Sequence, residues 1–474
     1  MLWTAVAAIT LLLPVSESAR AVQTYSPELS FSYVQGYNPD NPPPDCRQPG
    51  TAGCYPSAQD ACRAAFPTYV GILWDDAALA ICRYVNVNGS ISNSIGRAIG
   101  TSQFCAAGYA PQTPTRCQIT DRTQAAANLG PPCPGCGNPI NPATGNKYQA
   151  EVDYAGTGPM PLRFVRSYNS KAEGAGALGP AWRHSYESVV TYAVNADSVS
   201  LRRPSGKVII FNRQPDNSFV ADADVTGRLT GTFDAFLHPL GWTYTTPQDI
   251  TETYGADGKL VAATSHDGLT TTFFYDPAGR LQVVVEPSGR PLTFTYDASG
   301  RLVTMRIPGG GFVTYAYDAA GHLAAAAYPD GAVRRYHYEN PAYPQALTGI
   351  TDENGARMAT YAYDAQGRAV LSEHAGSANR HGLSYQTDGS AAVTDPLGTT
   401  RTYQFTAPRI RIKSSAIQGA PCDRCGVAAA TAYDANGFVA SRTDWNGNLT
   451  TYTHDARGLE TSRTEAAGTA QART

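Results

Sequence analysis

The sequence is poor in charged residues and has no strong excess of either sign. Asp, Glu, Lys and Arg make up 16% of its 474 residues, and the formal net charge at pH 7 is −3. So little charge is low for a helical protein and fits a turn-rich β protein. Because there is no basic excess, the composition predicts no nucleic-acid partner. No stretch approaches the ~20 consecutive apolar residues that a spanning helix needs, so we expect no integral membrane segment.

The common catalytic motifs are also missing. The sequence contains no Gly-x-Ser-x-Gly elbow, phosphate-binding loop or His-Glu-x-x-His motif. Its eight histidines are scattered singly, without a pair spaced four residues apart. The tripeptide Trp182-Arg183-His184 invites a catalytic interpretation, but we expect Trp182 to pack against a strand or turn and His184 to be exposed or hydrogen-bonded. We therefore expect no catalytic residues and no enzymatic activity.

The first 21 residues have the pattern of a signal peptide. Residues 3–15 are almost wholly apolar, and Ala19-Arg20-Ala21 provides a small-x-small cleavage site. No Lys or Arg precedes the apolar run, so the usual basic n-region is missing, and a buried or interfacial N-terminal segment is the alternative. The pattern predicts export to a bacterial periplasm, the cell surface or the exterior.

Cysteine is not scarce, since ten occur and six of them lie between residues 46 and 117. An even count in a short segment behind a signal sequence predicts a disulfide framework, whose pairing the sequence does not determine. We interpret residues 22–125 as a cysteine-rich, partly helical N-terminal region, with short helices capped by Ser57 and Asp75 that end near Phe66 and Tyr84. The disulfide candidates are Cys46, Cys54, Cys62, Cys82, Cys105 and Cys117.

Two Cys-x-x-Cys pairs lie outside that region. Cys133 and Cys136 end a linker over residues 126–137, and Cys422 and Cys425 lie in an insertion near the C-terminus. Four thiolates could bind one structural zinc ion in a tetrahedral site. An oxidising compartment favours local or mutual disulfides instead, and free thiols are the third alternative. No other cofactor is expected.

The strongest pattern in the sequence is an internal repeat. Tyr254, Tyr275, Tyr296, Tyr317 and Tyr338 follow one another at intervals of 21 residues. A glycine comes four residues after each of the first four tyrosines, and another glycine comes ten residues later. A period of this length is typical of repeat architectures, which build surfaces and shells more often than catalytic centres.

Within each unit, Tyr-Asp-x-x-Gly predicts the corner of a hairpin. The Asp carboxylate can accept backbone N–H groups inside a type I turn, and the glycine can take a positive φ without strain. Such a turn, with its bulge, joins two antiparallel strands. Because a lone hairpin is marginally stable, successive hairpins must pair edge to edge into a sheet that curls. The predicted turn residues are Tyr275, Asp276, Gly279, Tyr296, Asp297, Gly300, Tyr317, Asp318, Gly321, Tyr363, Asp364 and Gly367.

These units closely resemble the YD repeats of RHS proteins, and more distantly those of teneurins and of the cocoon subunits of Tc toxins. The resemblance covers residues 242–474. The motifs at 138–147, 161–170 and 178–186 make residues 138–241 similar to the β domain that commonly precedes RHS repeats in bacterial polymorphic toxins. The resemblance implies a mainly β fold, in which tandem hairpins form a curled or spiral antiparallel sheet, a partial shell, behind a small β domain.

In that family the shell holds a C-terminal toxin domain, which is released by self-cleavage near an Asp-Pro-x-Gly-Leu plug. The nearest candidates here, at 276–280 and 395–399, do not end in that way, and repeat-like sequence continues to Thr474. We therefore expect an N-terminal fragment, a truncated gene, or a scaffold whose cargo is encoded elsewhere.

The resemblance thus predicts an exported scaffold, the N-terminal part of a toxin-encapsulating β-shell used in toxin delivery or intercellular competition. Its expected partners are toxin cargo or a continuation of the shell. The alternative is a cell-surface module that binds carbohydrate or another partner. In that alternative Arg280, Arg301 and Arg368 could contact acidic sugars, although we expect them to pair across strands or to face solvent.

Overall fold

The computed structural model describes residues 24–25, 28–35, 69–74, 79–85, 91–104, 109–113, 116–119, 125–131, 140–192, 198–235, 238–421 and 428–474. The chain divides into two compact units, Met1–Ile119 and Thr120–Thr474, which are described separately below. In the part of the chain that is described, no helix is long and apolar enough to cross a lipid bilayer.

The described elements of the first unit are strands. One sheet has the order β2-β5-β4-β3 and another the order β1-β7-β6. The expected helix ending near Tyr84 is wrong, because this segment is strand β4, which pairs with β3 and β5. Its β-branched and aromatic residues favour a paired strand, and this pairing overrides the capping signal at Asp75. The bounds are β1 Thr24–Tyr25, β2 Glu28–Gln35, β3 Tyr69–Trp74, β4 Leu79–Val85, β5 Ile91–Phe104, β6 Tyr109–Thr113 and β7 Arg116–Ile119.

The other expected helix, from Ser57 to Phe66, lies outside the described residues, and so do Cys46, Cys54, Cys62 and Cys105. The backbones of Cys82 and Cys117 belong to β4 and β7, but their side chains are not described. The disulfide framework and the signal peptide therefore stay predictions.

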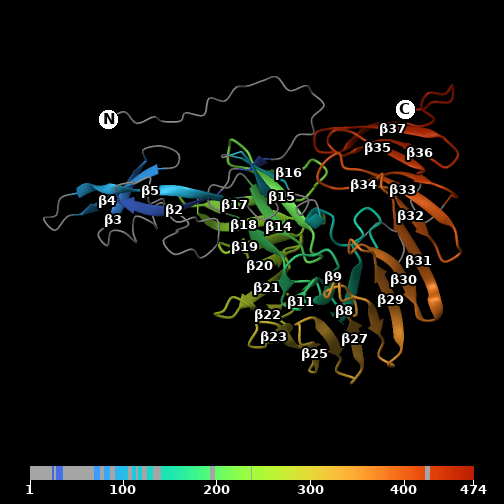
Figure 1. The fold of residues 1–474 in the computed structure, drawn as a ribbon, viewed down its shortest axis with the longest axis horizontal. Coiled ribbons are helices and arrows are strands. Elements are labelled where there is room, and N and C mark those ends of the chain that lie inside the picture. Colours follow the sequence, from blue (N-terminus) through green and yellow to red (C-terminus); the bar gives the residue numbers. More distant parts are fainter. Residues whose placement is uncertain are drawn as a thin grey trace. The chain divides into compact units, whose positions relative to one another are not determined.

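The second unit is dominated by one sheet of 26 strands, in which each strand pairs with the next one along the chain (Figure 1). The expected mainly β fold, with tandem hairpins in a curled antiparallel sheet, is confirmed. The sheet begins at β13, so its first strands come from residues before 242. These are β13 Val189–Thr191, β14 Ser198–Arg202, β15 Val208–Arg213, β16 Phe219–Ala221, β17 Arg228–Phe233, β18 Pro239–Thr245, β19 Thr251–Gly255 and β20 Leu260–Thr264.

The remaining strands follow the repeat, with a short 3-10 turn, η1, at Ala375–Ser377. Their bounds are β21 Thr270–Tyr275, β22 Leu281–Val285, β23 Pro291–Tyr296, β24 Leu302–Arg306, β25 Phe312–Tyr317, β26 Leu323–Ala327, β27 Val333–His337, β28 Gly349–Thr351, β29 Arg357–Tyr363, β30 Ala369–His374, β31 Ala378–Tyr385, β32 Ala391–Thr394, β33 Thr400–Thr406, β34 Lys413–Gln418, β35 Ala430–Tyr433, β36 Val439–Thr443, β37 Leu449–His454 and β38 Glu460–Thr464.

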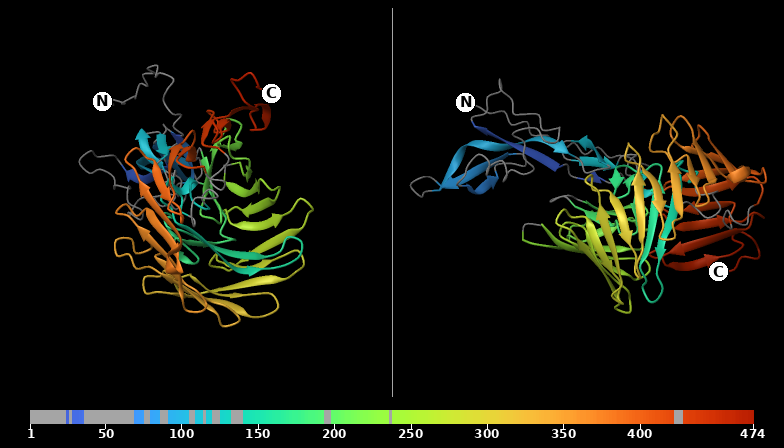
Figure 2. Two further views of the ribbon diagram at one scale, coloured as in Figure 1. Left: turned by 90° about the vertical axis from the view of Figure 1, so that its right-hand side faces the viewer. Right: turned by 90° about the horizontal axis from the view of Figure 1, so that it is seen from below.

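A smaller sheet lies inside the curve of the large one. Its order is β12-β9-β8, and a two-residue ladder, β10-β11, precedes β12. Figure 2 shows the repeat strands bending around this small sheet. Its buried aromatic residues share one hydrophobic core with the repeats. The bounds are β8 Tyr148–Ala155, β9 Arg163–Asn169, β10 Ala175–Gly176, β11 Gly179–Pro180 and β12 Trp182–His184.

Each regular repeat sends alternate side chains into this core. In the hairpin of β21 and β22, a bulge pairs Tyr275 with Leu281 and the next step pairs Phe274 with Val283. Leu281 and Val284 are buried, whereas Phe274 is 51% exposed on the outer face. The bulge therefore keeps both apolar residues of the outgoing strand on the inner face, despite their odd spacing.

Candidate functional site

The predicted turn residues lie at the corners of the hairpins. In the first regular unit, Oδ1 of Asp276 accepts the backbone N–H of Arg280 at 2.8 Å, and Oδ2 accepts Nε of the same arginine at 2.8 Å. Gly279 has φ +75°, a backbone conformation that glycine adopts without a Cβ clash. The hydrogen bonds from the Arg280 amide and guanidinium lower the pKa of Asp276. Both oxygens of the Asp276 carboxylate thus accept hydrogen bonds within the turn.

The turn arginine also contacts the next repeat. The Arg280 guanidinium lies 5.1 Å from the centre of the Tyr296 ring, and the Tyr296 hydroxyl donates to the Leu281 carbonyl at 2.6 Å. Arg301 and Tyr317 make the same contacts, at 4.6 and 2.5 Å. Each of these two units therefore forms an Asp–Arg–Tyr triad that ties it to the following unit through ion-pair, cation–π and hydrogen-bond contacts.

The triads change the interpretation of the repeat arginines. Arg368 pairs with Asp364 at 2.8 Å and lies 4.2 Å from the Tyr385 ring. Like Arg280 and Arg301, Arg368 pairs with the aspartate of its own turn and lies against the tyrosine of the next unit. The side chains of Arg280, Arg301 and Arg368 also remain 39%, 30% and 33% exposed, so the carbohydrate alternative stays a prediction.

Trp182 and His184 have structural positions. Trp182 is fully buried and its indole N–H donates to the Tyr338 hydroxyl at 2.8 Å, as expected for a packing residue. His184 is 1% exposed and its ring packs against those of Phe164 and Phe294, at centroid distances of 4.9 and 6.2 Å. Its Nδ1 accepts the backbone N–H of Tyr186 at 3.3 Å, and burial lowers its pKa. His184 is hydrogen-bonded as expected, but it is buried, not exposed.

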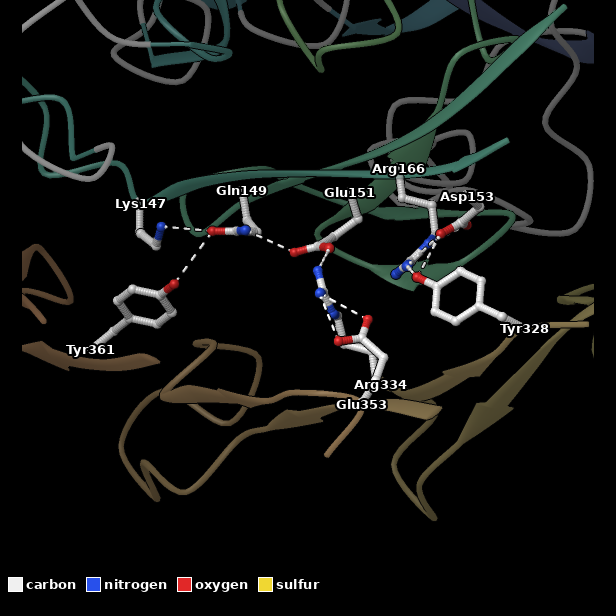
Figure 3. A network of polar contacts seen from close by, with 9 residues as sticks. All are labelled: Lys147, Gln149, Glu151, Asp153, Arg166, Tyr328, Arg334, Glu353 and Tyr361. Atoms are coloured by element: carbon white, nitrogen blue, oxygen red, sulfur yellow. Dashed lines mark hydrogen bonds and ion pairs between the residues drawn. The ribbon is translucent and has the colours of Figure 1, made fainter. Parts of the chain in front are cut away.

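The feature that sequence reasoning missed is a buried polar interface between the small sheet and the repeats (Figure 3). Its residues from the small sheet include Gln149, Glu151 and Asp153, which stand at alternate positions along β8 and share one face of the strand with Lys147 just before it. Alternation of this kind usually places the polar face in water, but here that face is turned toward the repeats. The interface residues are Lys147, Gln149, Glu151, Asp153, Arg166, Tyr328, Arg334, Glu353 and Tyr361.

Arg166 and Asp153 form the centre of this interface. Nε and Nη2 of Arg166 lie 2.6 and 2.8 Å from the two Asp153 oxygens, and both side chains are fully buried. The hydroxyls of Tyr315 and Tyr328 donate to the same carboxylate at 2.7 and 3.1 Å. Burial opposes the charge on Arg166, but Asp153 together with Tyr336 and Tyr315 outweighs burial and holds the Arg166 pKa above its ordinary value. The pair fixes the small sheet to two consecutive repeats.

A second branch continues along β8. Glu151 pairs with Arg334, which in turn lies 2.8 Å from Glu353. Gln149 donates to Glu151 at 2.8 Å and accepts Nζ of Lys147 at 3.0 Å. The Lys147 ammonium position lies 4.1 Å from the Tyr361 ring. The network therefore spans the repeats from β27 to β29.

Lys147 is the residue of this network whose pKa shift can be tested most directly by experiment. Burial lowers its pKa from 10.5 to about 7, although Glu151 opposes the shift. Between pH 7 and 10.5 the unfolded chain holds a proton that the folded chain lacks, so stability rises with pH across this window. Below pH 7 the full cost of burying the charge is present.

We expect Lys147→Met to remove this pH dependence. As the pH rises from 7 to 8.5, the free energy of unfolding of the wild type should increase by about 2 kcal/mol relative to the variant, since each pH unit contributes about 1.4 kcal/mol. Urea titration of both proteins at the two pH values measures the difference. Parallel pH profiles would show that Lys147 titrates near its ordinary pKa in the fold.

The predicted cysteine sites are not among these contacts. Cys133, Cys136, Cys422 and Cys425 all lie outside the described residues, so the zinc and disulfide alternatives both stay predictions. Among the described residues, no group of three or more His, Cys, Asp or Glu side chains is placed to hold a metal ion.

Family models match two parts of the chain. Residues 137–211 match a family described as "Domain of unknown function (DUF6531)". Residues 254–291, 275–311, 296–333 and 433–470 match the family described as "RHS Repeat". No curated protein matches the sequence.

The fold is also similar to parts of much longer solved structures. One is a Tc holotoxin pore of Photorhabdus luminescens, with 11% identity, a TM-score of 0.33, and coverage of 70% of this chain and 22% of that one. Another is the crystal structure of TcdB2-TccC3, with 11% identity, a TM-score of 0.30, and coverage of 82% and 25%. This chain therefore spans about a quarter or less of the length of those chains.

Proposed function

Because this chain is an RHS/YD-repeat protein, we propose that it is an exported scaffold, the N-terminal part of a β-shell that encloses a toxin for delivery or for competition between cells. The observation that carries the proposal is the continuous 26-stranded wall curved around an inner face. Repeats 254–369 pack this inner face on the small sheet. A wall held by its own inter-repeat contacts is suited to enclosing another polypeptide.

The same reasoning favours a scaffold over an enzyme. The repeat carboxylates are hydrogen-bonded within their turns, and His184 is enclosed by aromatic rings. The partners that fit the scaffold are toxin cargo or further repeats that extend the shell. Export, with oxidation of the N-terminal cysteines, belongs to the same proposal and rests on the apolar residues 3–15 and the cleavage site that ends at Ala21.

Co-expression tests the scaffold directly. The full chain is expressed together with the product of the reading frame that follows it, and the purified material is treated with protease. We expect cargo or a shell continuation to co-purify and to become resistant to cleavage. A folded chain that purifies alone, and leaves the co-expressed product as sensitive to protease as it is by itself, would contradict the proposal.

A further inference from the structure

The repeat unit that contains strand β34 lacks the Asp-x-x-Gly turn of the regular units. Lys413 lies 5.1 Å from the Tyr433 ring, and the Tyr433 hydroxyl donates to the Ser414 carbonyl at 3.1 Å. These are the contacts that Arg280 and Leu281 make with Tyr296 in a regular unit. Lys413 therefore occupies the position of the turn arginine.

The carboxylate that pairs with Lys413 does not come from the turn of its own unit. A regular unit has Asp four residues before the cation and Gly one residue before it, but here Arg409 and Ile412 stand at those positions. Instead, Nζ of Lys413 lies 2.7 Å from Oδ2 of Asp224. Asp224 follows β16, among the first strands of the wall, and its side chain is 6% exposed. The Asp–cation–Tyr triad is thus completed across the spiral.

Neighbouring contacts support this long-range junction. Nη1 of Arg411 donates to the Asp224 carbonyl at 3.3 Å, and the amide of Ile410 donates to Asp222 at 3.5 Å. Oδ1 of Asn128 accepts the Ile412 amide at 2.9 Å. Figure 1 shows the sheet returning so that β34 lies near β16. The segment before β34 therefore rests on the start of the wall.

Lys413 also reaches the strands that follow. Its Nζ donates to the Gly437 carbonyl at 2.5 Å, at the corner between β35 and β36. One side chain thus contacts the first strands through Asp224 and the last strands through Gly437 and Tyr433.

Strands β35–β38 have little else to hold them. β34 pairs with β35 through a single register pair, Ala416 with Ala430. Among the residues described after Ile417, Gly437 is the only one that is buried. The positions equivalent to buried Leu281 and Val284 carry Val439, which is half-buried, and Arg442, which is exposed. A segment with so few buried contacts opens at low free-energy cost.

We propose that Asp224 supplies the carboxylate that the Lys413 unit lacks, and that this borrowed contact is the latch that holds strands β35–β38 against the first strands of the wall. When the latch breaks, β35–β38 lose their contacts with the first strands while the regular repeats stay folded. The latch is a property of the wall itself and does not depend on the proposed cargo.

Hydrogen exchange of the full chain tests the latch. In Asp224→Asn and in Lys413→Met, we expect amides of β35–β38 to exchange roughly tenfold faster, with β21–β30 unchanged. The double variant should exchange about as fast as Lys413→Met alone, because the contact with Asp224 is already lost in that variant.

Asp257→Asn is the matched control. Asp257 pairs with Lys259 at 3.0 Å, and Lys259 lies 5.5 Å from the Tyr275 ring, but the first two residues lie in the corner between β19 and β20 and Tyr275 ends the neighbouring strand β21. This variant should leave β35–β38 unchanged. Wild-type exchange of β35–β38 in the latch variants would overturn the proposal, as would an equal loss of protection in β21–β30, which would mark the pair as a general stability element.

Discussion

Asp153→Ala is expected to destabilise the second unit by about 3–5 kcal/mol, because it leaves the Arg166 charge buried without its counter-ion. Both side chains are fully buried. The substitution also removes the acceptor of the Tyr315 and Tyr328 hydroxyls. Urea unfolding followed by circular dichroism measures the loss, and the midpoint should fall without a change in slope.

Two further variants distinguish the cost of leaving the Arg166 charge buried and unpaired from the cost of removing any carboxylate. Asp257→Ala removes an exposed partner of Lys259 and should cost less than about 1 kcal/mol. The double variant Asp153→Leu/Arg166→Met replaces the pair by apolar side chains and should be more stable than Asp153→Ala, since no charge is stranded. Equal losses for Asp153→Ala and Asp257→Ala would mean that water reaches Arg166.

Gly258→Ala should cost about 3 kcal/mol, which is the second-largest effect that we expect. A Cβ at this position would lie 1.9 Å from the Val190 carbonyl oxygen, and Gly258 has φ +75°. The strain of a positive φ costs about 1–2 kcal/mol. Relieving the clash also breaks the hydrogen bond from the Val190 amide to the Gly258 carbonyl, which contributes about 1 kcal/mol.

Gly268→Ala is the control that isolates the close approach. Gly268 has φ +81°, and a Cβ there would meet no atom within 4 Å. Its cost should be only the backbone strain of about 1–2 kcal/mol. If the two variants lose equal stability, the junction between β13 and the Gly258 corner contributes nothing, and the first strands of the sheet are free to separate from it.

The repeat could be predicted from the sequence because its signals are local. The Asp276 carboxylate bonds the amide of a residue four positions away, and Gly279 takes its φ from the same turn. Turn chemistry and strand alternation act within a few residues, so they are visible in the order of residues alone. The same information could not show that Arg280 would lie on the ring of Tyr296, since that contact requires the register of two adjacent hairpins.

The polar interface escaped prediction for the opposite reason. Alternate polar residues along β8 are compatible with either a solvated face or a buried network. Only the partners decide between the two, and Tyr315, Tyr328 and Arg334 come from repeats far along the chain. The expected helix that became β4 shows the same limit, because pairing with β3 and β5 outweighed a capping signal.

Residue order alone determined that hairpins of one kind recur and must join side by side, because corner geometry and side-chain alternation are short-range properties. Tertiary structure decided which polar groups are shielded from water, which strand ends meet across the spiral, and that Asp224 serves a lysine in β34. Those outcomes depend on the curvature of the sheet, which accumulates over many strands and brings together residues that no local pattern relates.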